Sequence, residues 1–203
     1  KYIREFTNID WLRVTAFHMD EYLGISDESA QSFGNWLRSN LFNHIDFGAV
    51  HFLNPNPAHI DEELTRYSDL INSAPIDIVC LGIGENGHIA FNDPTVADFK
   101  DPKTVKAVKL EDTSRQQQVN EACFRKLSDV PPEALTITVP VLFNGKTLIC
   151  VVPGKKKSLA VKQTIEGDIS VDCPASILRR HSDAHLFLDY DSAELLNLEE
   201  LAG

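Results

Sequence analysis

Hydrophobic positions along this chain repeat with two alternating periods, and the order of those periods predicts an α/β protein. Short apolar runs typical of buried strands are followed by longer segments with apolar residues at helical spacing. The predicted strands cover residues 11–18, 50–53, 76–81, 104–110, 134–139, 147–152 and 185–188, and the predicted helices cover residues 29–45, 60–72, 113–126, 155–166, 174–180 and 192–201. This alternation predicts a mainly parallel sheet covered on both faces, without a clear domain boundary.

The stretch after the central predicted strand holds most of the candidate chemistry. The apolar run 76–81 leads into three glycines, Gly82, Gly84 and Gly87, which let the backbone turn sharply and approach a ligand. Ligands of open α/β sheets bind beyond the carboxyl ends of the strands. The glycine spacing also matches the dinucleotide-binding pattern, but no amphipathic helix follows the third glycine. A nicotinamide site is therefore not our prediction.

His88, in this glycine-rich stretch, has neighbours that suit acid–base catalysis. An imidazole titrates near neutral pH and can move a proton in either direction. Asn86 and Asp93 lie close by in the sequence and could orient the ring or change its pKa. An isolated histidine is more often structural, but three polar groups in one glycine loop favour a site. His88, Asn86 and Asp93 are therefore candidate catalytic residues.

Asp20 and Glu21 follow the first predicted strand directly. A carboxylate at the carboxyl edge of the sheet could face the same crevice as His88 and act as a general base. The alternative is a helix cap or a solvent-exposed acid pair, and the sequence leaves both interpretations open.

Positive charge gathers at two predicted helix starts. Lys155, Lys156 and Lys157 follow a Pro-Gly pair, and Arg115 lies near the start of the helix predicted over residues 113–126. Unpaired backbone N–H groups and the helix dipole favour an anion at such places, and lysine is a common phosphate ligand. Two of the three lysines fit a solvent-exposed turn. The cluster still indicates a phosphate site, with Arg115 as a second candidate cation.

The composition limits the kinds of partner. The 203 residues carry 30 acidic and 19 Lys or Arg side chains, a net charge of −11, and 43% of them are hydrophobic. One α/β domain with a sizeable core fits this length. The acidic balance argues against nucleic-acid and membrane-surface partners but allows an anionic small molecule in a locally basic pocket. Neither a metal-ligand spacing nor a GxSxG element is present.

The cysteines favour a reducing compartment. None of Cys80, Cys123, Cys150 and Cys173 forms a CxxC pair, so buried free thiols are a better interpretation than disulfides. We find no signal peptide and no apolar run of transmembrane length. These features predict a cytoplasmic protein.

Two motifs resemble the glucosamine-6-phosphate deaminase/isomerase family. Residues 17–24, FHMDEYLG, are similar to the family segment F-N-M-D-E-Y-x-G. Residues 81–94, LGIGENGHIAFNDP, are similar to the family loop G-I-G-x-[DN]-G-H-I-A-F-N-E-P. Residues 134–139 and 154–158 give weaker support, and the likeness extends from about residue 11 to the end of the chain.

The resemblance implies a three-layer α/β/α, Rossmann-like fold with a mainly parallel sheet. It also implies a reaction without cofactor or metal. The substrate would be glucosamine 6-phosphate or an epimer, converted to a ketohexose 6-phosphate and ammonia. The implied partner is this small phosphosugar, with no nucleic acid and no membrane, and the protein would be a monomer or a homo-oligomer.

The motifs imply roles for four catalytic residues. Asp20 would carry the proton between C2 and C1, and His88 would assist ring opening. Asn86 and Asp93 would tune the histidine. The chain departs from the family pattern at these places: Asn86 stands where Asp is frequent, Asp93 where Glu is usual, and His18 where Asn is usual.

The resemblance also implies the substrate-binding residues, which are Lys157 for the phosphate together with Glu21, Gly87 and Arg115. The family has an N-terminal segment with a Gly-Ser/Thr phosphate loop ahead of the Asp-Glu-Tyr motif. Residues 1–203 are therefore expected to form a single glucosamine-6-phosphate isomerase-like domain, N-terminally truncated relative to the family.

Two alternative functions follow from the same residues. A 6-phosphogluconolactonase has a similar G-x-G-x-D-G-H loop, but that family usually continues with T-A-S-L-F-P, whereas residues 89–94 here are IAFNDP. The second alternative is a non-catalytic sugar-phosphate sensor on the same fold, which would bind phosphosugars without turnover.

Overall fold

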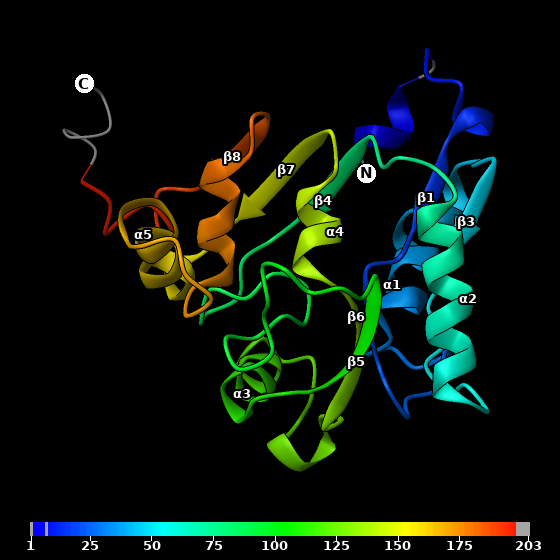
Figure 1. The fold of residues 1–203 in the computed structure, drawn as a ribbon, viewed down its shortest axis with the longest axis horizontal. Helices are drawn as coiled ribbons and strands as arrows, with labels where there is room; N and C mark the ends of the chain where they lie inside the picture. The colour runs from blue at the N-terminus through cyan, green and yellow to red at the C-terminus, as the bar shows by residue number, and fades with distance from the viewer. Residues whose placement is uncertain (1, 7, 198–203) are drawn as a thin grey trace.

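The computed structural model describes residues 2–6 and 8–197, which form a mixed α/β fold (Figure 1). Two sheets are parallel. The first pairs β1 (Thr15–Phe17) with β3 (Ala49–His51). The second has the order β4 (Ile78–Leu81), β7 (Thr147–Val152) and β8 (Ala184–Leu188). A third sheet is antiparallel, in the order β2 (Asp20–Tyr22), β6 (Glu133–Ile137) and β5 (Val105–Lys109). The parallel sheets agree with the predicted α/β class.

The helices lie around these sheets. They are α1 (Phe33–Asn40), α2 (Ile60–Asn72), α3 (Asp112–Asn120), α4 (Val139–Phe143) and α5 (Ser158–Glu166), with short 3₁₀ segments that include Trp11–Arg13, Lys155–Lys157 and Pro174–Arg180. In Figure 1, α1 and α2 lie beside β1 and β3, α5 lies at the opposite side near β8, and α3 lies below the central strands. Within the described ranges, no helix is both long and apolar enough to cross a membrane.

Most predicted elements are present, with three informative differences. The strand predicted over 11–18 is a 3₁₀ turn followed by β1, and the Asp-Glu-Tyr motif forms its own strand, β2. The segment joining β6 to β7 contains α4, because Pro140 in its first turn favours a helix start. Helix α3 ends six residues before its predicted end, and Ala122 just beyond it has a positive φ of 59°.

The predicted closing helix, residues 192–201, is not confirmed. Residues 192–195 form turns in the described part of the chain, and residues 198–201 lie outside the described residues. Residues 144–145 form the turn that follows α4.

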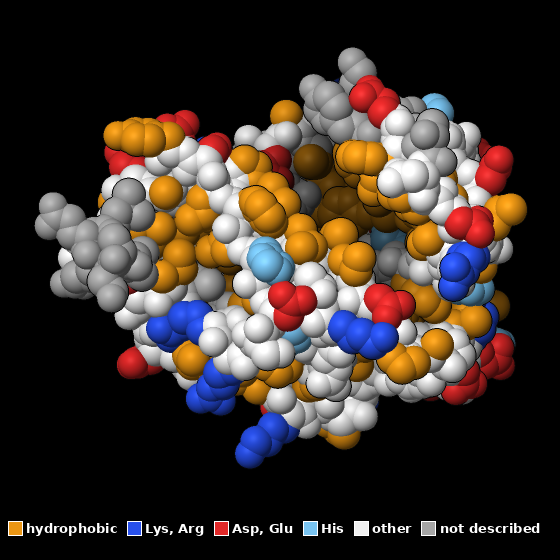
Figure 2. Space-filling model, turned by 90° about the horizontal axis from the view of Figure 1, so that it is seen from above, with side chains coloured by type: hydrophobic (Ala, Val, Ile, Leu, Met, Phe, Trp, Pro, Cys, Tyr) orange, Lys and Arg blue, Asp and Glu red, His pale blue; other side chains and the backbone are white. Residues whose placement is uncertain are grey.

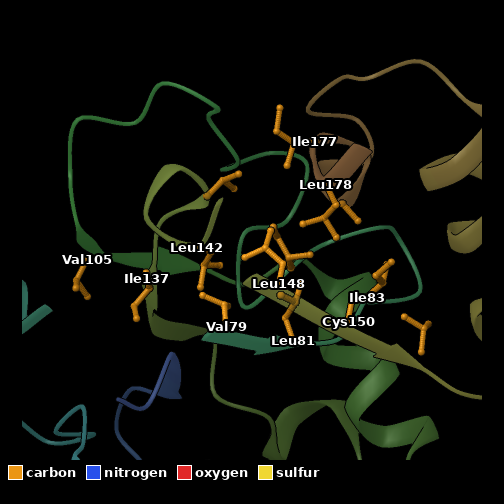
Figure 3. Packing of buried hydrophobic residues seen from close by; sticks show 14 of the residues in the cluster. Val79, Leu81, Ile83, Val105, Ile137, Leu142, Leu148, Cys150, Ile177 and Leu178 are labelled. Atoms are coloured by element: carbon orange, nitrogen blue, oxygen red, sulfur yellow. The ribbon is translucent and has the colours of Figure 1, made fainter. Parts of the chain in front are cut away.

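The main hydrophobic core lies on one face of the β4-β7-β8 sheet (Figure 3). Figure 3 shows side chains from β4, β7, α4 and the segment Pro174–Arg180 pointing toward one another, among them Val79, Leu81, Leu142, Leu148, Cys150, Ile177 and Leu178. Ile83 and Ile89, from the stretch after β4, are buried in the same cluster. The loop that carries His88 is therefore anchored in the core at two points.

The other face of this sheet is open in the described structure. Ile78, Val151 and Phe187 come from three neighbouring strands and are 61%, 53% and 54% exposed. Figure 2 looks onto the end of the molecule that lies at the top of Figure 1 and shows a hollow with hydrophobic side chains on its walls. The two faces of β7 thus differ sharply in burial.

Val152 and Val151 give a matched test of this difference, because they are adjacent residues of the same type on one strand. Val152 is 1% exposed, so Val152→Ala is expected to lower the free energy of unfolding by about 1.5–3 kcal/mol. Val151→Ala, on the open face, is expected to change it by less than about 1 kcal/mol. Urea denaturation of both variants measures the two values, and equal losses would contradict the assigned core face.

Candidate active site

The loop after β4 has a tight geometry that requires glycine at two positions. A Cβ on Gly84 would lie 2.1 Å from the Cε1 atom of His88, so the backbone packs directly against the imidazole ring. Gly84 N–H also donates to the His88 carbonyl at 2.9 Å. Gly87 has a φ of +83°, and a Cβ there would lie 2.6 Å from the Cys173 sulfur. The two glycines thus hold His88 in a closed turn.

His88 contacts the two residues that the sequence analysis assigned to it. Its Nδ1 lies 2.7 Å from Asn86 Oδ1 and 3.1 Å from Asp93 Oδ1. The His88 side chain is 11% exposed, and that of Asp93 is fully buried. The structure therefore brings together three of the four candidate catalytic residues.

Asp93 is a buried carboxylate that accepts several hydrogen bonds. Its Oδ1 accepts from Asn86 Nδ2 at 3.1 Å and from the Ser114 hydroxyl, and its Oδ2 accepts from the Glu111 backbone N–H at 3.3 Å. Burial alone would raise the pKa of Asp93. The hydrogen bond and charge of His88, with bonds from Ser114 and Asn86, outweigh burial and hold that pKa below its ordinary value. Asp93 is thus ionised and can accept a hydrogen bond from a protonated Nδ1 of His88.

Asp20 lies on a strand that contacts the histidine loop through β6. It pairs with Thr136 in the β2–β6 ladder. The Thr136 hydroxyl oxygen accepts from the Phe91 backbone N–H at 3.1 Å, and Asn92 Nδ2 donates to the Ile137 carbonyl at 2.9 Å. In the described part of the chain, no hydrogen bond joins Asp20 to His88. Strand β6 therefore connects the strand that carries Asp20 with residues 91 and 92 of the histidine loop.

Burial, with a smaller contribution from the charge of Glu21, raises the pKa of Asp20 to about 7. A carboxyl group with a pKa near neutrality can both accept and release a proton at physiological pH. This property suits Asp20 to the base role predicted for it.

Glu21, one residue later, is in a different environment. It is 1% exposed, and its carboxylate accepts from Ser32 Oγ at 2.7 Å and from Gly34 N–H at 2.9 Å at the N-terminus of α1. A carboxylate at this place satisfies unpaired N–H groups and interacts favourably with the helix dipole. These contacts within the protein give Glu21 a structural role. Its contact with a substrate stays a prediction.

The two candidate cations are both paired with protein groups. Lys157 Nζ lies 3.2 Å from Glu121 Oε1, and its side chain is 14% exposed. Arg115 donates to Asp112 at 2.9 Å and to the carbonyls of Leu127 and Val130 at 2.9 and 3.0 Å. Arg115 thus holds the segment after α3, while Lys157 has one acidic partner.

The remaining predicted ligand, Gly87, uses both backbone groups within the protein. Its N–H donates to the Gly84 carbonyl at 3.1 Å, and its carbonyl accepts from Ala175 N–H at 2.9 Å. Its predicted contact with a substrate stays a prediction.

Helix α3 contributes residues that the sequence analysis missed. Ser114 contacts Asp93 and His88, and Gln117 Oε1 accepts from the Glu85 backbone N–H at 2.9 Å. Both side chains are buried, although the helix sequence DTSRQQQVN contains a single apolar residue. The sequence signal was a predicted helix without an apolar face, which could have indicated that its polar side chains contact the site.

The arrangement is suited to proton transfer by side chains. Within the described residues, no group of three His, Cys, Asp or Glu side chains is placed to hold a metal ion. The candidate titratable groups are an imidazole oriented by a buried carboxylate and, on β2, a second carboxyl group with a pKa of about 7. Such a pair fits proton abstraction next to a carbonyl or imine carbon.

The raised pKa of Asp20 predicts a pH-dependent effect on stability. The folded protein keeps a proton on Asp20 up to about pH 7, whereas the unfolded chain loses it near the ordinary pKa of 3.8. The folded state therefore binds more protons between about pH 4 and 7, and the contribution of Asp20 to stability falls as pH rises through that window. Asn does not titrate, so Asp20→Asn should gain stability relative to the wild type between pH 4 and pH 8.

Urea denaturation at the two pH values measures this gain. Asp46→Asn, at an exposed position, is the matched control and should differ from the wild type equally at both pH values. The same constant difference for Asp20→Asn would contradict the raised pKa.

Comparison with known proteins agrees with this geometry. A family model described as glucosamine-6-phosphate isomerases/6-phosphogluconolactonase matches residues 2–187. A glucosamine-6-phosphate deaminase from Exiguobacterium sibiricum is 38% identical over 192 residues, which are 94% of this chain and 74% of the relative. The match therefore covers β2, the histidine loop and most of the chain.

Solved structures give the same assignment. A monomeric glucosamine-6-phosphate deaminase has a TM-score of 0.88 and 33% identity, covering 96% of this chain and 80% of its own. A 6-phosphogluconolactonase from Thermotoga maritima has a TM-score of 0.70 and 20% identity, covering 92% and 77%, a likeness that concerns the fold alone. The chain belongs to the glucosamine-6-phosphate isomerase/6-phosphogluconolactonase family.

Proposed function

We propose that this protein is a glucosamine-6-phosphate deaminase, which converts an amino-sugar 6-phosphate and water to a ketohexose 6-phosphate and ammonia. The observation that carries the proposal is the higher sequence identity of this chain to deaminases than to a lactonase. Proteins named as glucosamine-6-phosphate deaminases are 33% and 38% identical over more than nine-tenths of this chain, whereas the lactonase is 20% identical.

Ring opening is assigned to His88. Opening the sugar ring removes a proton from the O1 hydroxyl and delivers a proton to the ring oxygen O5. Asn86 and Asp93 occupy Nδ1, so Nε2 is the nitrogen left to exchange a proton with the sugar. The buried Asp93 carboxylate stabilises the positive charge that the ring carries while it holds both protons.

Isomerisation is assigned to Asp20. Its carboxylate takes the proton from C2 of the open-chain aldehyde and returns a proton to C1. The aldehyde oxygen O1 gains a proton and the C2 amino group loses one, so that an imine at C2 and a hydroxymethyl group at C1 result. Addition of water to that imine releases ammonia and forms the ketone. The pKa of about 7 supports this role, because the same group must first accept and then donate a proton.

Phosphate binding is assigned to Lys157. Its ammonium group is largely buried and has one acidic partner in the described structure, Glu121. A substrate phosphate would replace that carboxylate as the partner of the lysine, because a dianion attracts the ammonium more strongly than a single carboxylate does.

The proposed reaction uses side chains alone, without a cofactor, and we propose a cytoplasmic location. All four cysteines are free thiols, although Cys80 is exposed and only Cys150 and Cys173 are fully buried. Exposed free thiols suit a reducing compartment.

Ammonia release from glucosamine 6-phosphate tests the proposal on the natural gene product, with galactosamine 6-phosphate and 6-phosphogluconolactone alongside. Turnover of an amino sugar is expected, and Asp20→Asn is expected to reduce it by about 100-fold or more, the scale of a lost general base. Hydrolysis of the lactone instead would favour the lactonase. Phosphosugar binding without any turnover would favour the sensor. Full turnover by Asp20→Asn would contradict its role as the base.

Lys157 and Lys156 form a matched pair for the phosphate assignment. Lys157→Met is expected to raise KM for glucosamine 6-phosphate by about 10- to 100-fold, the effect of one lost charged hydrogen bond. Lys156 is exposed, so Lys156→Met is expected to leave KM unchanged. An equal rise of KM in both variants would reflect a general loss of positive charge. It would contradict a specific contact between Lys157 and the phosphate.

A further inference from the structure

Ser114 contacts every member of the histidine cluster. Its hydroxyl oxygen lies 3.2 Å from His88 Nδ1 and 3.4 Å from Asn86 Nδ2, and it donates a hydrogen bond to Asp93 Oδ1. The residue is 3% exposed and comes from α3, more than twenty residues away in sequence from His88 and Asp93. The loop alone therefore does not complete the cluster.

The backbone of His88 fixes the directions of these hydrogen bonds. His88 N–H donates to Asn86 Oδ1 at 3.2 Å, so the amide oxygen faces the histidine and the amide nitrogen faces Asp93. An amide oxygen accepts only, and an ionised carboxylate accepts only. The proton of the neutral ring therefore lies on Nδ1, and the lone pair lies on Nε2.

The same logic assigns the Ser114 proton. Asp93 Oδ1 can only accept, so the hydroxyl donates to it and offers its own lone pairs to Asn86 and His88. The Asp93 carboxylate is fully buried, and removing one donor would leave it with a poorly satisfied charge. The carboxylate could then rotate, and the ring that depends on it would lose its fixed orientation.

We propose that Ser114 is a positioning residue for His88, which holds the Asp93 carboxylate and thereby keeps the Nδ1–H group of the imidazole fixed and Nε2 free for the sugar. The kinetic part of this inference rests on the proposed function. The orientation of the ring does not depend on it.

Helix α3 is itself fixed against the loop, which gives Ser114 a rigid support. Gln117, one turn later, accepts from Glu85 N–H at 2.9 Å, and its amide donates to Glu121 at 2.9 Å. Glu121 in turn contacts Lys157. The buried polar side chains of α3 therefore contact the histidine loop, and Gln117 also contacts Glu121, the residue after the helix, which pairs with Lys157.

NMR of ¹⁵N-histidine-labelled protein tests the ring orientation directly, with the His88 signals identified by their loss in His88→Gln. The wild type should show a protonated Nδ1 whose N–H exchanges slowly with water. Ser114→Ala should accelerate that exchange by about tenfold or more, the loss of roughly one hydrogen bond. Ser114→Thr keeps the hydroxyl and should restore slow exchange. Thr113→Ala removes an exposed hydroxyl from the same helix and should have no effect.

Kinetics adds a second readout. Ser114→Ala should lower kcat about tenfold with little change in KM, because the hydroxyl contacts the histidine cluster and not the sugar. A wild-type Nδ1–H signal and kcat in Ser114→Ala, with only a lower Tm, would overturn the proposal. An Nε2–H tautomer in the wild type would overturn it as well. If no amino sugar is turned over, the NMR arm still decides the role of Ser114, and only the proposed function fails.

Discussion

The site depends on one buried negative charge, the carboxylate of Asp93. A carboxylate without solvent contact is stable only when donors surround it. Here the donors come from the histidine loop, from Ser114 on α3 and from the backbone at Glu111. Satisfying this charge therefore requires the loop after β4 and the start of α3 to lie together. Orientation of His88 follows from the same contacts.

Two adjacent acids show how strongly local structure decides chemistry. Asp20 and Glu21 lie on one short strand, with side chains that point to opposite faces. Glu21 accepts hydrogen bonds at the N-terminus of α1, and its charge supports a helix. The pKa of Asp20 is raised to about 7, chiefly by burial, and such a pKa suits a group that carries protons. The strand thus separates a structural carboxylate from the one to which we assign the base role.

The sequence predicted most of the strands and helices, the glycine loop and the grouping of His88 with Asn86 and Asp93, because these features are local in the chain. It could not predict that β2 would pair with β6 or that Ser114 would reach Asp93, because both contacts join distant segments. Helix α3 offered only one candidate from the sequence, Arg115, near the predicted helix start. Its buried polar face has a meaning only once the loop that it contacts is known.

The central claim is that His88, Asp20 and Lys157 act on one phosphosugar. A crystal structure of the natural protein with the reduced, open-chain analogue of glucosamine 6-phosphate tests this most directly, because the analogue lacks the carbonyl and cannot react. The account predicts the phosphate on Lys157 in place of Glu121, C2 beside the Asp20 carboxylate, and His88 Nε2 within hydrogen-bond distance of the sugar. An analogue bound in the cavity between residues 24–31 and 119–131, out of reach of His88, would contradict it.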